Sequence, residues 1–160
     1  MDALTIYIID ESILWAHLFS AILFIGGSFF MWIVLVPSLK QMEEPQRTLM
    51  MGRISKRFAK LTGILLFILV STGLYNAMIY LSGRFYIPSS RFLLVVLMAS
   101  ATVILITLLY GPGRYFGKKI VRLAKEGKLQ ELNNTRKKSR IVSIVNLSLM
   151  VFISVVAVLM

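Results

Sequence analysis

The sequence of 160 residues contains one histidine and no cysteine, so few of its residues could bind a metal or transfer a proton. His17 lies in an apolar run, residues 12–36, that has no Lys, Arg, Asp or Glu. Ionisable groups in such runs often have a functional role. Imidazole is a common axial ligand of haem iron, and it also forms hydrogen bonds between packed helices. His17 is therefore interpreted in two ways. It is either a metal ligand or a residue that packs and forms a hydrogen bond between helices.

Residues predicted to lie at the depth of His17 are its candidate partners. Asn76 and Met98 each lie about five or six residues inside their own apolar runs, within ~3 Å of the His17 layer by helix rise. Methionine sulfur ligates haem iron opposite histidine in some proteins, so Met98 or Met78 is a candidate second ligand. Methionine is also a common apolar filler of helix interfaces, and this alternative stays open.

Three further polar residues are candidates for binding or for interhelical bonds. Arg84 and Arg91 are predicted just outside the His17 layer, where guanidinium groups would meet haem propionates. Arg91 would serve equally as an interfacial anchor of its helix. Asn146 lies about five residues inside the fourth apolar run, and we expect it to form a hydrogen bond to another helix.

The composition excludes several classes of chemistry. A chain without cysteine has no disulfide, thiol nucleophile, iron–sulfur cluster or Cys-ligated zinc. One histidine and no carboxylate inside the runs leave no acid–base pair, two-metal site or Ser-His-Asp set. The run 111–113, Gly-Pro-Gly, is predicted to stop a helix and not to bind phosphate. Copper(I) prefers sulfur ligands, and the only adjacent methionine pair is Met50-Met51.

The elements that position these residues are four apolar runs, 12–36, 61–81, 92–110 and 141–160. The chain is 58% apolar with a mean hydropathy of +0.80. Each run is long enough to span a bilayer as a helix. We therefore predict an all-α membrane protein, a single domain over 1–160, with four transmembrane helices in an up-down-up-down bundle.

The basic residues predict the orientation. Of 18 Lys and Arg, 16 lie between the first and second runs or between the third and fourth. The positive-inside rule places both segments in the cytoplasm and both termini outside. Such clusters also attract anionic lipids, and nucleic-acid binding is disfavoured. Within them, 47–60 and 114–125 are predicted to be helical and Gly127 to stop a helix, whereas 131–139 is predicted to be a mobile linker.

The order of several short motifs resembles the CopD-like integral membrane proteins, and more remotely the HemJ-type protoporphyrinogen oxidases. The motifs are Trp-Ala-His-Leu at 15–18, Phe-Ile-Gly-Gly-Ser-Phe-Phe at 24–30, Val-Pro at 36–37, Arg-Phe at 57–58 and Thr-Gly-Leu at 72–74. The resemblance implies a membrane bundle of four or more helices, with a b-type haem on the first helix in some members and copper uptake in others. The HemJ pattern has a lysine within the third helix, and 92–98 here has none. Only His17 is carried over, as a candidate haem ligand.

Three functions follow as expectations. The first is b-type haem binding near the outer face for electron transfer or haem-linked redox chemistry, with an unidentified redox partner. The second is copper transport or resistance, with His17 as a metal ligand. The third is a non-catalytic accessory or structural membrane subunit. In each case we expect a homo-oligomer or a subunit of a membrane complex.

Overall fold

The computed structural model describes residues 2–81 and 89–159, and within these ranges every regular element is a helix. Four stretches are long and apolar enough to cross a membrane: Leu4–Gln41, Gln46–Ile79, Phe92–Lys125 and Leu129–Val158. The prediction of an all-α, four-helix membrane protein is confirmed. The elements are α1 (Ala3–Phe30), the π-helix η1 (Met31–Leu35), α2 (Val36–Ser38), the 3-10 helix η2 (Leu39–Gln41), α3 (Glu44–Leu81), α4 (Ser89–Leu108), the π-helix η3 (Leu109–Gly113), α5 (Arg114–Lys125) and α6 (Leu129–Leu159).

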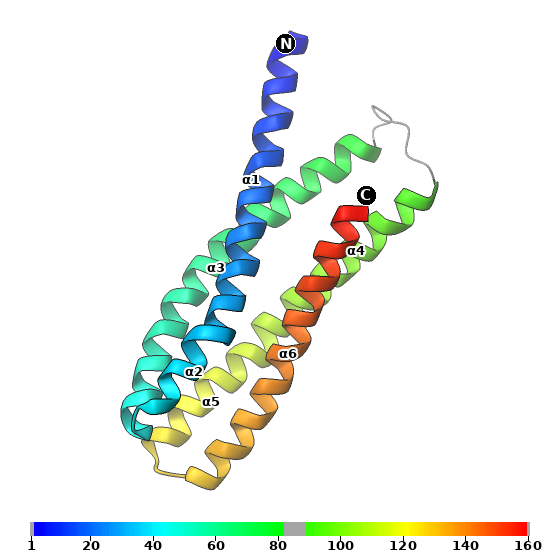
Figure 1. Cartoon of the computed structure of the whole chain (residues 1–160). Coiled ribbons are helices and arrows are strands. Elements are labelled where there is room, and N and C mark those ends of the chain that lie inside the picture. Colours follow the sequence, from blue (N-terminus) through cyan, green and yellow to red (C-terminus); the bar gives the residue numbers. More distant parts are fainter. Residues whose placement is uncertain (1, 82–88, 160) are drawn as a thin grey trace.

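The long helices alternate in direction, so the two chain termini lie at the same end of the bundle (Figure 1). α1 packs along α3, and α4 packs along α6. The opposite end is formed by residues 37–60 and 111–140 and carries 16 of the 18 Lys and Arg. We call it the basic end.

The buried core is small and joins all four long helices. Phe24 of α1, Leu65 and Leu66 of α3, Leu105 of α4 and Met150 of α6 form one cluster. Most other apolar side chains of the spans face outward. Such a surface suits a bilayer, because lipid tails solvate apolar side chains while each helix satisfies its own backbone.

The predicted helix stop at 111–113 is wrong. Residues 109–113 form η3, and the chain continues directly into α5. Pro112 has no backbone N–H to donate, and the wider π turn accommodates this loss. α2 and η2 extend the first helix beyond its predicted end at residue 36, and α1 begins at Ala3, earlier than predicted.

The predicted linker over 131–139 is also wrong, because α6 begins at Leu129 and includes the whole segment. Leu132 and Thr135 are buried. Arg136 forms a two-pronged hydrogen bond to Glu44 at the start of α3, with distances of 2.6 and 2.9 Å. These tertiary contacts hold as helix a segment that composition alone marks as polar. Gly127, with a φ of 69°, separates α5 from α6 as predicted.

Candidate functional site

His17 lies on α1 at its interface with α3, and its side chain is half-buried. Its Nδ1 is 2.8 Å from Oγ1 of Thr72 on α3. The sequence depth argument named Asn76 as its neighbour, but the bond goes to Thr72, one turn closer to the basic end. Asn76 is half-buried on the same side of α3.

The hydrogen bonds of Thr72 favour a proton on Nδ1 of His17. A threonine hydroxyl has one proton to donate and two lone pairs to accept with. Thr72 donates to the carbonyl of Ile68, at 2.6 Å, within its own helix. With its own proton used in this way, Oγ1 accepts from Nδ1–H of His17, and the lone pair of the neutral ring then lies on Nε2.

Gly73 leaves room for the imidazole. A Cβ built on Gly73 would lie 3.3 Å from Cε1 of His17 and 3.9 Å from Nδ1. The first distance is tighter than ordinary van der Waals contact, so a larger residue would push the ring away from α3. Gly73 and the adjacent Thr72 together form a cradle that holds one edge of the ring.

The other predicted ligands are not brought to His17. Met98 is half-buried on α4, whose main packing partner is α6, and Met78 is exposed on α3. Arg84 lies outside the described residues, and so does the side chain of Arg91, so their roles stay predictions.

A second polar contact joins the same two helices and was missed in the sequence. Tyr75 of α3 donates from its hydroxyl to Oδ1 of Asp10 on α1, at 2.8 Å. Asp10 precedes His17 by two helical turns, which places both residues on the same face of α1. The spacing of seven residues between Asp10 and His17 could have indicated in the sequence that both side chains lie on one face of the first helix.

Asn146 is buried in α6, with an exposed fraction of 6%. Its Oδ1 accepts no hydrogen bond from any residue that the structure describes. The interhelical bond expected of this carbonyl oxygen is therefore not seen within the described ranges. The side chain lies one turn from Met150 of the core cluster.

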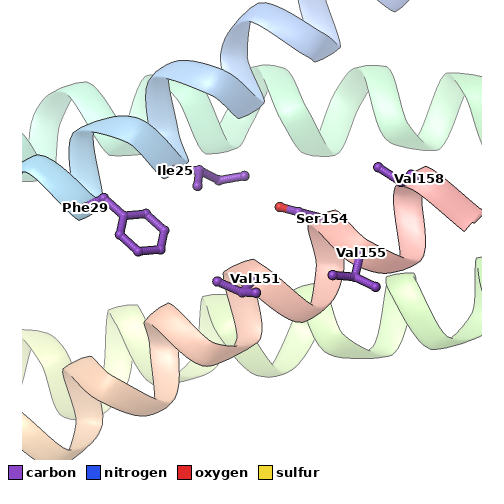
Figure 2. A pocket seen from close by; sticks show the side chains of 6 residues that line it. All are labelled: Ile25, Phe29, Val151, Ser154, Val155 and Val158. Atoms are coloured by element: carbon purple, nitrogen blue, oxygen red, sulfur yellow. The ribbon is translucent and has the colours of Figure 1, made fainter.

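An apolar groove of about 450 Å³ opens between α1 and α6 (Figure 2). Ile25 and Phe29 line it from α1, and the other lining residues are Val151, Ser154, Val155 and Val158 of α6. Ile25 lies eight residues beyond His17, or about 12 Å along the helix axis. His17 does not line the groove, so the groove is a separate feature.

The donor chemistry at His17 fits one axial ligand of a haem. Imidazoles that bind metals usually donate their other ring N–H to a protein acceptor, as Nδ1–H does here to Thr72. Within residues 2–81 and 89–159, no three or more His, Asp or Glu side chains gather as a metal-binding group. A metal or haem bound here would thus have one imidazole nitrogen as its ligand from these side chains. Neither the family models, nor the curated proteins, nor the solved structures compared with this chain contain a match.

Proposed function

We propose that this chain is a membrane-integral protein that binds b-type haem through His17 for electron transfer or haem-linked redox chemistry. The observation that supports the proposal is the bond from Nδ1–H of His17 to Thr72, because it leaves the Nε2 lone pair available to iron. The bound haem would supply a one-electron couple. Thr72 would fix the orientation of the imidazole, and Gly73 would keep the space in which the ring lies.

The second axial position belongs to the same proposal. Met98 remains a candidate if the α4–α6 pair approaches α1, and His17 of a second copy of the chain is the other. The second arrangement would make the protein a homo-oligomer. It would also explain why the chain has only one imidazole.

A structural role for His17 is the second candidate function. The bonds from His17 to Thr72 and from Tyr75 to Asp10 tie α1 to α3. In an accessory membrane subunit, these two bonds would simply fix the packing of the helix pair. No described arrangement favours copper transport over either candidate.

The distribution of basic residues supports an orientation of the protein in the membrane. We place the basic end in the cytoplasm and both termini outside, in a prokaryotic inner membrane. A reporter enzyme that is active only outside the cytoplasm, fused after Met160, should be active.

An absorption spectrum of the purified protein tests the function directly. The protein is expressed with excess haem, purified in mild detergent, and recorded oxidised and dithionite-reduced. We expect a Soret band with sharp α and β bands after reduction. A flat spectrum would reject haem binding and favour the structural role.

Substitution of His17 tests the ligand. His17→Ala should lose the Soret band, because the only imidazole of the chain is gone. Ser71→Ala is the matched control, since this exposed hydroxyl precedes Thr72 in α3, and it should retain full haem occupancy. Full occupancy in His17→Ala would show that His17 is not the ligand.

A further inference from the structure

At the basic end, α5 lies antiparallel to the first half of α3 (Figure 1). Two glycines of α3 mark close approaches between this helix and the chain from η3 to α5. A Cβ built on Gly52 would lie 3.5 Å from Cγ2 of Val121, and one built on Gly63 would lie 3.5 Å from the hydroxyl oxygen of Tyr110. We call the interface between α3 and the chain from η3 to α5 the seam. These two contacts lie at its two ends, where the helices approach closely.

Four cations lie along the seam between these two contacts. On α3, Lys56 and Lys60 lie between Gly52 and Gly63 at the spacing of one helix face. On α5, Arg114 and Lys118 occupy the corresponding stretch between Tyr110 and Val121. All four cations are exposed.

The surface of α5 among these cations is uncovered at Gly117. A Cβ built on Gly117 of α5 would meet nothing within 4 Å, in contrast to Gly52 and Gly63 at the two ends. We call this region the basic slot, defined by Lys56, Lys60, Arg114, Gly117 and Lys118.

Acidic residues do not neutralise the basic slot. Glu44 pairs with Arg47 and Arg136. Glu126 pairs with Arg122 and Lys128. Among the residues that the structure describes, no ion pair joins a carboxylate to a slot cation. The slot therefore concentrates positive charge that an external anion would stabilise.

Aromatic and apolar residues place the slot at the edge of the bilayer. The guanidinium of Arg114 lies over the ring of Tyr110, with 4.4 Å from Cζ to the ring centroid. Tyrosine and arginine are both typical of the membrane interface. Beyond Lys60, α3 presents Ile64 and Phe67, which are 61% and 74% exposed. A charged slot thus continues directly into an apolar surface along the same helix.

We propose that the basic slot binds the phosphate of an anionic phospholipid, with the acyl chains of that lipid lying along Ile64 and Phe67. The cations favour any phosphate, whereas the adjoining apolar surface favours one that carries acyl chains. The same reasoning disfavours nucleic acid, which would leave this surface uncovered.

Native mass spectrometry of the full-length protein in neutral detergent tests the proposal. Phosphatidylglycerol and phosphatidylcholine of equal chain length are titrated in parallel, and retained lipid is counted. We expect the wild type to retain phosphatidylglycerol preferentially. The Lys56→Gln/Arg114→Gln double variant should retain about tenfold less. Equal retention of the two lipids by the wild type would overturn the proposal.

A matched double variant separates the slot from net charge. Lys137→Gln/Lys138→Gln removes two exposed cations at the same end of the bundle, on α6, and should change retention less than twofold. Equal losses in the two double variants would overturn the proposal. Gly117→Leu adds a bulky side chain among the four cations without changing their charge and should also reduce retention. Wild-type retention by this variant would count against the proposal.

Soluble competitors identify the source of the phosphate. Glycerol phosphate and a short single-stranded RNA are added at the lipid concentration. Displacement of phosphatidylglycerol by glycerol phosphate would show that acyl chains contribute nothing, and displacement by RNA would show a nucleic-acid surface. Each of these results overturns the proposal, whereas retention of the lipid supports it.

Discussion

Thr72 uses its hydroxyl in two bonds, and under the proposed haem binding this dual use would orient His17 toward the iron. The proton satisfies the Ile68 carbonyl of its own helix, and a lone pair accepts from Nδ1–H of His17. A threonine bonded only to its own helix would need no function. The bond across to α1 makes Thr72 a positioning residue for the imidazole.

Replacing Thr72 by valine should weaken haem binding while leaving His17 in place. Valine has nearly the same shape but cannot accept the Nδ1–H bond, and loss of such a partner typically costs 10–100-fold in metal affinity. Haem titration followed at the Soret band measures this change. Thr72→Ser keeps the hydroxyl and should bind within about threefold of the wild type. Equal weakening in both variants would assign Thr72 a packing role only.

Asn146 offers a test of stability at a single atom. A buried carbonyl oxygen without a hydrogen bond costs about 1–3 kcal/mol. Asn146→Leu removes this polar group at similar volume and should raise the thermal midpoint in detergent, measured by loss of soluble protein on heating. A lower midpoint would show that Asn146 binds a water or another polar partner in the native protein.

The residue types of the candidate site were predictable from the sequence, but their pairing was not. His17 was identified because it is the only imidazole and lies in an apolar run. Depth counted along each helix cannot fix the register between α1 and α3, and an offset of one turn exchanges Asn76 for Thr72. The register between α1 and α3 depends on side-chain packing, such as the space beside Gly73 that the His17 ring occupies.

At the scale of elements, the fork from Arg136 to Glu44 joins the start of α3 to the first turns of α6. Arg136 also donates to the buried hydroxyl of Thr48, at 2.9 Å. The hydrogen bonds from Arg136 hold the pKa of the Glu44 carboxyl below its usual value. Ionised Glu44 therefore stabilises the fold at neutral pH.

Acidification should remove this stabilisation. Because the pKa of Glu44 is lower in the folded chain, its contribution is complete above the unfolded pKa of about 4.3 and is lost as pH falls through the folded value. Glu44→Gln should reduce the free energy of unfolding at pH 7 by roughly 1 kcal/mol, and the thermal midpoint should therefore fall. The wild type and the variant should converge once the pH lies below the lowered folded pKa of Glu44.

Glu43→Gln serves as the control for this pH dependence. It removes an adjacent, exposed carboxylate and should leave the midpoint at pH 7 nearly unchanged. A constant difference between Glu44→Gln and the wild type from pH 7 to pH 3 would show that ionisation of Glu44 is not the cause.

Element type was more predictable than element boundaries. Runs of about 20 apolar residues identify spanning helices because bilayer thickness sets their length. The Gly-Pro-Gly at 111–113 and the polar stretch at 131–139 suggest breaks, yet both are helical. A π turn accommodates the proline, and contacts with α3 secure the polar stretch.

At the scale of the whole molecule, the bundle consists of two antiparallel pairs, α1 with α3 and α4 with α6. The core cluster joins the two pairs. Helix pairs that form independently in a membrane can associate afterwards, as in two-stage folding.

A chain divided between residues 84 and 85 should therefore reassemble. Co-expressed halves, 1–84 and 85–160, are expected to co-purify in mild detergent through an affinity tag on the first half. Leu105→Ala, in the core cluster, should reduce recovery of the second half several-fold, because it leaves a cavity between the pairs. Ile104→Ala alters an exposed neighbour and should not. Equal loss of recovery in the two variants would show that the core cluster does not hold the two helix pairs together.

Trp32 lies beneath Arg140, with 5.8 Å between the guanidinium carbon and the ring, near the basic end. Trp15 lies beside Phe19, toward the end that holds both termini. These are the only tryptophans of the chain, about 25 Å apart along one continuous rod. A bilayer spanned by this rod would have one tryptophan in each leaflet, so two single-tryptophan variants with quenchers of known depth would give the position of the protein along the bilayer normal without an added label.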